Sequence, residues 1–219
     1  MPPGAPASCH SRLTVAPHYA GTRLGRALDR RRLGDARFSI VANDCWAAEV
    51  YKRLDRPFNT PFIGNFLFGP DFTRLVANLD RCLAEPLKMG VSSRYVDSPT
   101  YPVGTIGDDV EIHFLHYASS AEAAEKWQRR LERFEWDAVR VKVSAGKDLI
   151  DDETLSAVRS RPGGLVLSRR PLATGDVAVS RFTDNGRALF RRSIRRFDLV
   201  EWLRTGTIRP APAYGRLLS

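Results

Sequence analysis

The chain has 219 residues, of which 43% are hydrophobic and 27% charged, a composition typical of a globular protein large enough to bury a core. It holds no run approaching the roughly 20 apolar residues that a membrane-spanning helix needs. The formal net charge is +9, yet the sequence lacks zinc-finger, RRM and KH signatures, which argues against a nucleic-acid-binding protein.

The ends of the chain differ in composition from its middle. Residues 1–22 hold four prolines and no apolar run, so they predict a flexible leader rather than a secretory signal, and we expect a cytoplasmic protein. Residues 23–205 predict a single α/β domain, and residues 206–219 predict a loose Pro-rich tail. The three cysteines have no CxxC spacing, so we expect no disulfide framework.

The first half of the chain begins as an α/β sheet does, with a strand, a tight turn and a helix. Residues 38–42 form a short apolar run typical of a buried strand, and residues 45–54 have helical spacing with Asp44 as their N-cap. Residues 56–69 predict a structured loop, and residues 70–84 predict one amphipathic helix.

The second half alternates strands with helices. Residues 110–117 predict a strand, and Ser119 followed by Glu122 has the capping-box spacing that opens a helix ending near Phe134. The remaining expected elements are strands at 138–143, 164–168 and 177–182 and helices at 152–159 and 197–204. This alternation favours a three-layer α/β fold, a mostly parallel sheet flanked by helices on both faces.

The tetrapeptide Asn43-Asp44-Cys45-Trp46 is the first candidate site, because ligands of α/β folds bind at the carboxyl ends of strands. A thiol in the first turn of a helix faces the positive end of the helix dipole, which favours the thiolate that a nucleophile requires. The same turn could bind an anion through its backbone N–H groups. Alternatively, Cys45 is a small core residue, Asp44 is a cap and Trp46 is a packing residue.

Two histidines of the strand at 110–117 form the second candidate. A regular strand alternates its side chains, so His113 and His116 point to opposite faces and cannot jointly hold a metal. We expect a structural role for His113, whereas His116 lies near the end of the strand, where a general base would be useful. The sequence has no HxH, HExxH or CxxC spacing, and we expect no metal site.

Charged residues around this strand form weaker candidates. Asp108 and Asp109 follow a turn-forming Tyr-Pro-Val-Gly segment, and this acidic pair either orients a histidine or keeps the loop hydrated. Lys126 and Arg130 are four residues apart on the helix that Ser119 opens, so they form a cationic strip that meets either a phosphate or water.

Arginine-rich segments at 23–37 and 187–196 carry much of the positive charge. Such a surface attracts anionic lipid headgroups or the phosphates of nucleotides and CoA, unless it is only a solvated face. The chain has no GxGxxG, Walker, GxSxG or DxD motif. These absences argue against a standard dehydrogenase, kinase, serine hydrolase or metal-dependent glycosyltransferase.

Several ordered blocks of the sequence carry a family resemblance. The blocks are Phe38–Trp46, Phe58–Gly64, Tyr101–Gly104, Asp109–Tyr117 and Ala123–Trp127 with Arg130. Over about Phe38 to Phe182 the chain resembles a bacterial family, the domain of unknown function nineteen-nineteen, whose members are often labelled exopolysaccharide or capsular polysaccharide biosynthesis proteins. The arginine-rich start and the tail fall outside the resemblance.

The resemblance implies a role in making a surface polysaccharide, and some members are described as acyltransferases. The polar positions that members of the family share correspond to residues of this chain, which the resemblance marks as site candidates without assigned roles. Those positions are Asn43, Asp44, Cys45, Asn59, His113, His116, Lys126 and Arg130.

Our leading hypothesis is an enzyme that moves an acyl group from CoA to a polysaccharide precursor. Cys45 would be its nucleophile or oxyanion-turn residue, and His116 its general base, oriented by Asp44 or Asp108. The expected substrate-binding residues are Asn43, Trp46, Asn59, Thr60, His113, Tyr117, Lys126 and Arg130. We expect no tightly bound cofactor, since the CoA thioester would be a co-substrate.

Two alternatives remain at this stage. One is a non-catalytic accessory protein of the polysaccharide assembly machinery, whose basic segments dock on the membrane surface or on a partner. The other is a glycosyltransferase-like enzyme without a DxD metal site, which would bind a nucleotide sugar in place of acyl-CoA.

Overall fold

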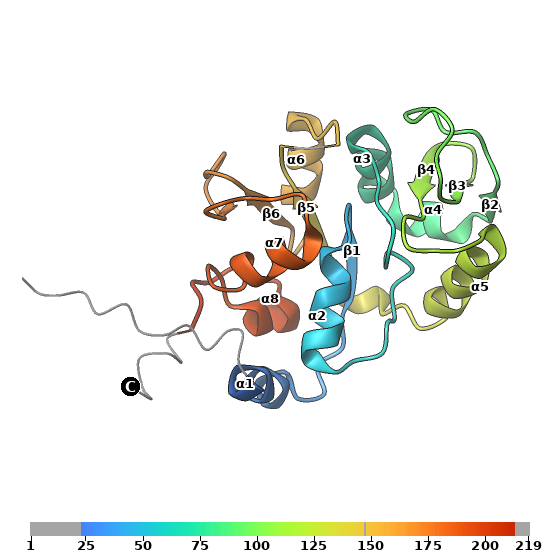
Figure 1. Ribbon diagram of the computed structural model, residues 1–219. Helices are drawn as coiled ribbons and strands as arrows, with labels where there is room; N and C mark the ends of the chain where they lie inside the picture. The colour runs from blue at the N-terminus through green and yellow to red at the C-terminus, as the bar shows by residue number, and fades with distance from the viewer. Residues whose placement is uncertain (1–22, 147, 213–219) are drawn as a thin grey trace, which may run out of the picture.

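The structure is a computed structural model that describes residues 23–146 and 148–212 (Figure 1). The leader expected at 1–22 and the last seven residues of the expected tail lie outside the described residues. None of the helices in the described part is long and apolar enough to cross a membrane.

The larger sheet has four parallel strands in the order β1-β5-β6-β7. These strands are β1 (Ser39–Ala42), β5 (Val139–Ser144), β6 (Leu165–Ser168) and β7 (Val177–Ala178). The apolar runs therefore predicted the positions of all four strands, although the strand expected at 177–182 ends at Ala178. In the register of the first pair, Ala42 lies beside Lys142. The strand ends that carry the candidate site thus meet at one edge of the sheet.

Helices cover both faces of this sheet, so the predicted three-layer α/β fold in a single domain is confirmed (Figure 1). Ile40 and Ala42 of β1 point to one face, and Val41 between them points to the other. The first face carries α1 (Arg23–Leu33), α2 (Trp46–Leu54), α7 (Gly186–Ser193) and α8 (Leu199–Thr205). The second face carries α3 (Gly69–Ala77), α4 (Leu79–Ala84), α5 (Ser120–Leu131) and α6 (Asp152–Arg159).

A second, antiparallel sheet lies beside α3 and α4 and has the order β2-β3-β4 (Figure 1). Its strands are β2 (Leu87–Met89), β3 (Val103–Ile106) and β4 (Val110–His113). The prediction of one strand over 110–117 was wrong in its length, because the chain turns after His113: the Tyr117 N–H donates to the Phe114 carbonyl. Leu115 and His116 are exposed in this turn. The Val-Gly segment expected to form only a turn is instead the start of β3.

Three other helical predictions changed in the structure. The single helix expected at 70–84 is two helices, α3 and α4, because Asn78 adopts the non-helical angles φ −132° and ψ 44°. Helices α1 and α7 were not predicted, since their sequences are rich in arginine and carry few apolar residues. A short 3-10 helix, Trp136–Ala138, leads into β5.

The loop between α2 and α3 joins the two sheets. Its Phe66 pairs with His113 at the end of β4, and the Leu67 N–H donates to the Asn43 carbonyl at the end of β1 (3.0 Å). These bonds place the ends of β1 and β4 on either side of one loop. At the other end of the chain, residues 206–212 lie against the segment before α8, where the Asp198 N–H donates to the Arg209 carbonyl (2.8 Å).

Candidate functional site

The carboxyl ends of β1 and β5 hold a buried polar network. The Nζ of Lys142 lies 2.7 Å from Asp44 Oδ1 and 2.5 Å from the hydroxyl of Ser144. The Ser144 hydroxyl donates to Asp44 Oδ2 (2.7 Å), and the side-chain oxygen of Asn43 accepts from the Ser144 N–H (2.9 Å). Asp44 Oδ1 also accepts the Trp46 N–H, which begins α2 (3.0 Å). The N-cap position of α2 is Cys45 and not the expected Asp44, but the Asp44 side chain still accepts the first helical N–H and adds a cross-strand ion pair.

This network fixes the turn between β1 and α2. Lys142 has no exposed side-chain surface and Asp44 only 5%, so both charges are withdrawn from bulk solvent. A buried charge that loses its partner costs about 3–5 kcal/mol, because its desolvation is then uncompensated. The ammonium also lies 5.7 Å from the centre of the Trp46 ring, in cation–π contact. The turn is thus held from both the strand side and the helix side.

Cys45 is the half-buried residue on this turn and the N-cap residue of α2. Its Sγ lies 3.7 Å from the carbonyl oxygen of Asn65. Helix α7 begins against the same turn, since a Cβ on Gly186 would lie 3.2 Å from the carbonyl carbon of Cys45. Because the starts of α2 and α7 meet here, the positive ends of both helix dipoles lie near the thiol. The thiol itself donates to the Asn65 carbonyl and caps no N–H group of α2.

Other residues expected at this site have structural positions. Trp46 is fully buried, where its indole N–H donates to Ser193 and its ring packs on Phe190. The Thr60 hydroxyl donates to the Ile40 carbonyl (2.7 Å), within the body of β1. Asn59 donates to the Phe38 carbonyl (2.8 Å), which places it at the amino end of β1, away from Cys45.

The structure brings Tyr117, Lys126 and Arg130 together on α5 and the turn before it. Arg130 donates to the Tyr117 hydroxyl (2.5 Å) and to the Ile63 carbonyl (3.3 Å), and Tyr117 itself donates to that carbonyl. Lys126 lies 5.6 Å from the centre of the Tyr117 ring and pairs with Glu122. Burial raises the pKa of Tyr117, although the Arg130 guanidinium opposes that shift. These side chains brace the loop that contacts Cys45.

The two candidate histidines differ in exposure. His116 is exposed, and its backbone N–H donates to the Gly64 carbonyl (3.1 Å), next to the Asn65 whose carbonyl contacts Cys45. Cys45 and His116 therefore flank one short piece of loop. His113 is fully buried among aromatic rings, with Phe66 stacked on it at 4.6 Å between centroids.

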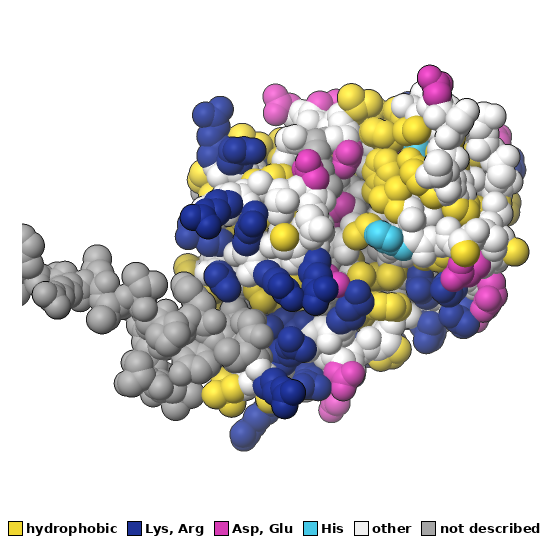
Figure 2. All heavy atoms as spheres, in the orientation of Figure 1, with side chains coloured by type: hydrophobic (Ala, Val, Ile, Leu, Met, Phe, Trp, Pro, Cys, Tyr) yellow, Lys and Arg dark blue, Asp and Glu magenta, His cyan; other side chains and the backbone are white. Residues whose placement is uncertain are grey.

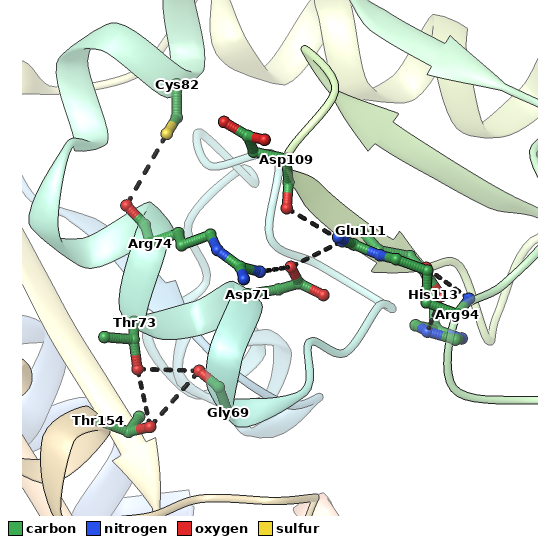
Figure 3. Close-up of polar contacts among 10 residues, drawn as sticks. All are labelled: Gly69, Asp71, Thr73, Arg74, Cys82, Arg94, Asp109, Glu111, His113 and Thr154. Atoms are coloured by element: carbon green, nitrogen blue, oxygen red, sulfur yellow. Dashed lines mark hydrogen bonds and ion pairs between the residues drawn. The ribbon is translucent and has the colours of Figure 1, made fainter.

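A second buried cluster, missed in the sequence, surrounds His113 (Figure 3). Arg94 donates to Asp71 on α3 (2.8 Å) and to Glu111 on β4 (2.9 Å from its N–H), so it joins the helix to the small sheet. The Nε2 of His113 lies 2.8 Å from Glu111 Oε1, but neither ring nitrogen makes a well-aligned hydrogen bond within the described residues. Asp71, Glu111 and His113 are buried, whereas the Arg94 side chain that connects these elements of the fold is 43% exposed.

Burial and pairing shift the pKa values in this cluster in different directions. Burial lowers the pKa of His113 and outweighs the nearby Glu111 carboxylate, which opposes the shift. Burial also raises the pKa of Asp71, against the opposing hydrogen bond from Tyr95. Burial would raise the pKa of Glu111 too, but the hydrogen bonds from Ser93 and Arg94 lower it overall. Burial thus disfavours the charged form of His113, whereas the hydrogen bonds from Ser93 and Arg94 favour the charged form of Glu111.

Asp108, expected to orient a histidine, is not near His116. It lies in the turn before β4 and pairs with Lys88 of β2 (2.6 Å), while His116 follows β4 at its other end. Four strand residues at about 3.3 Å each separate these ends by roughly 10 Å or more. Hydrogen bonding to Lys88 lowers the pKa of Asp108.

The residues that complete the site, Lys142 and Ser144, were missed in the sequence. Their local signal is the alternation of three polar residues, Arg140, Lys142 and Ser144, with the valines of Val139–Ser144. Within 23–146 and 148–212, no group of three or more His, Cys, Asp and Glu side chains is placed to hold a metal. The described groups at this edge are therefore a thiol, a carboxylate, an ammonium and a hydroxyl, which suit acid–base and nucleophilic chemistry.

Comparison with known proteins gives a family match and one similar relative. The family described as "Domain of unknown function (DUF1919)" matches residues 22–160. A protein of Haemophilus influenzae, described as an uncharacterized protein, is 37% identical over 108 residues, which are 49% of this chain and 50% of the relative. The match to the family includes Cys45, Lys142 and Ser144, and it ends before α7.

Proposed function

The chain belongs to the family of the domain of unknown function DUF1919, and on that premise we propose that it is an acyltransferase of surface-polysaccharide biosynthesis. The reacting residue is Cys45, the donor is a CoA thioester and the acceptor is a hydroxyl of a polysaccharide precursor. The observation that carries the proposal is the half-buried thiol on a turn that the buried Asp44–Lys142 pair holds at the carboxyl edge of the sheet. The polysaccharide acceptor rests on the resemblance of the sequence.

The proposed reaction has two steps. The Cys45 thiolate attacks the thioester carbonyl, the carbon–sulfur bond to CoA breaks, and CoA leaves as its thiolate, so the acyl group is carried on Cys45. N–H groups in the first turn of α2 stabilise the oxyanion that forms during the attack. A sugar hydroxyl then gives its proton to His116 and attacks the acyl group, and the Cys45 thiolate leaves.

A direct test is intact-mass spectrometry of the purified chain after incubation with acetyl-CoA. We expect an acetyl adduct on the wild-type chain and on Cys82→Ser, and none on Cys45→Ser. Cys82 is a matched control because it is also half-buried, and burial raises the pKa of its thiol. An adduct of equal yield on Cys45→Ser, or none on the wild type, contradicts the proposal.

A second test separates the two steps. His116→Ala should still form the adduct but release it more slowly to an oligosaccharide acceptor, since the acceptor hydroxyl loses its base. In a deletion strain, wild-type protein should restore acylation of the surface polysaccharide, and Cys45→Ser should not. Equal restoration by both removes the catalytic role of the thiol.

A non-catalytic accessory protein is the second candidate. The observation that favours it is that Asp44, Lys142 and Ser144 satisfy one another in a buried network, which is the arrangement of a structural ion pair. In that case the carboxyl edge would bind a carbohydrate precursor without modifying it. Binding of an oligosaccharide with no adduct on Cys45 would favour this function.

A further inference from the structure

A groove lined by cations lies between α1, α2 and α7. We call it the basic groove; its volume is about 480 Å³, and its lining residues are Arg26, Glu49, Lys52, Arg53, Arg187, Phe190, Arg191, Ile194 and Arg195. It thus has six cations and one carboxylate. Figure 2 shows Lys and Arg side chains gathered over the part of the surface that these three helices form.

Half of the six cations of the basic groove have a carboxylate partner among the described residues; one of them, Arg53, pairs with the buried Asp29 at 2.6 Å. Lys52 and Arg187 share Glu49, at 2.8 Å and 3.8 Å. Arg26, Arg191 and Arg195 have no carboxylate within 4.0 Å in the described part of the chain. These three guanidinium groups are therefore available to an anionic ligand.

The arrangement on α7 is unfavourable for the helix itself. Arg187, Arg191 and Arg195 follow one another at intervals of four residues, so they lie along one side of the helix and the turn after it. Like charges at this spacing destabilise a helix by a few tenths of a kcal/mol per pair. Within the described fold only Arg187 of these three has a carboxylate nearby, Glu49 at 3.8 Å, so a bound anion would offset the repulsion that remains.

The size and lining of the basic groove indicate the class of ligand. Its volume is within the roughly 300–1,000 Å³ of small-molecule sites. Guanidinium groups bind phosphate oxygens in pairs, and several of them together suit a group that carries more than one phosphate. Phe190 and Ile194, nearly buried at the groove, offer an apolar surface for the uncharged part of such a ligand.

We propose that the basic groove binds the diphosphate of a soluble, nucleotide-bearing ligand. The assignment of this ligand as the CoA donor of acyl transfer rests on the proposed function. The geometry fits that assignment, because Arg187 follows Gly186, whose Cβ position lies 3.2 Å from the carbonyl carbon of Cys45. The α2 residues of the groove, Glu49, Lys52 and Arg53, follow Cys45 by about one to two helical turns, a distance that the pantetheine arm of CoA would have to span.

The test is titration calorimetry of the full chain with inorganic pyrophosphate, ADP and CoA. The groove variant carries Arg187→Gln, Arg191→Gln and Arg195→Gln. The control variant changes the charge equally on the other side of the molecule, with Arg81→Gln, Arg129→Gln and Arg133→Gln. We expect the groove variant to lose about tenfold or more in affinity for all three ligands, and the control variant to keep the wild-type affinity.

Three results would overturn the inference. The first is equal affinity of the groove and control variants for pyrophosphate. The second is binding of the wild-type chain to phosphatidylglycerol vesicles with no binding of pyrophosphate, ADP or CoA, which would assign the groove to a membrane surface. The third is a groove variant that unfolds at a lower temperature than the wild type, since replacing exposed, mutually repelling arginines should not destabilise the fold.

The outcome for the basic groove is separable from the outcome for Cys45. Cys45→Ser should bind pyrophosphate and CoA as the wild type does, because the thiol is not in the groove. Normal CoA binding without an adduct on Cys45 would support the groove and contradict acyl transfer. An adduct that forms equally on the groove variant would support Cys45 and contradict the groove as the donor site.

Discussion

Replacing Lys142 with methionine tests the buried network at the carboxyl edge most directly. The substitution keeps the length of the side chain and removes the ammonium that lies 2.7 Å from Asp44 and 2.5 Å from Ser144. The Asp44 carboxylate, 5% exposed, then remains buried without its cation. We expect a loss of about 3–5 kcal/mol in the free energy of unfolding. At about 2–4 °C per kcal/mol for a chain of this size, the melting temperature should fall by roughly 6–20 °C.

The assay is thermal and urea unfolding followed by circular dichroism. Lys88→Met is the matched control, because Lys88 also lies on a strand and pairs with Asp108 at 2.6 Å, but both members of that pair are exposed. We expect no measurable change in that control. The double variant Asp44→Asn with Lys142→Met should recover much of the loss, since no charge is then left buried. Wild-type stability of Lys142→Met, or a double variant no more stable than the single one, would refute the reasoning.

Three further predictions concern the packing and titration of the fold. Gly69→Ala should destabilise the chain by about 1–3 kcal/mol in urea unfolding, because its Cβ would lie 2.0 Å from the Leu149 carbonyl oxygen; an unchanged midpoint would contradict that close approach. Ser119→Ala should cost about 0.5–2 kcal/mol, since the Ser119 hydroxyl accepts the Glu122 N–H at the start of α5, and Ser119→Asp should retain the cap. Burial lowers the pKa of His113 below 6.5 in the folded chain, so the unfolded chain binds more protons and stability should fall as pH drops below about 6.5. His113→Phe should flatten that dependence between pH 7.5 and 5.5, and an unaltered slope would show that another group causes it.

Short-range pattern was enough for much of the fold. The helix expected at 152–159 has those bounds in the structure, and the strand expected at 38–42 is β1 with one residue fewer. The strand is a short run of apolar residues. The helix combines an apolar period with a local start signal, because the Asp151 side chain accepts the Thr154 N–H. Such signals lie within a few residues of one another, so they can be read before the fold is known.

Helices α1 and α7 show where local pattern was insufficient. Their arginines obscure the apolar face, and in α7 that face consists of few residues, among them the buried Leu189 and Phe190. The face becomes evident only when the sheet and α2 are present to cover it, because most helical stability in proteins comes from tertiary packing. For the same reason the basic groove could not be placed from the sequence, since its two arginine-rich walls are more than a hundred residues apart.

The candidate site also has features that were predictable from the sequence and features that depend on tertiary structure. The sequence by itself determined that a strand ends at Asn43 and Asp44 and that a helix follows at once, expected from Cys45 and found from Trp46, because both signals are local. Only the tertiary structure decided what fixes that turn. Parallel pairing of β1 with β5 sets Lys142 beside Ala42, and it thereby joins Asp44 to a lysine 98 residues away. No periodicity within either strand specifies which strand will be its neighbour, so the ion pair that holds the Cys45 turn is a property of the assembled sheet.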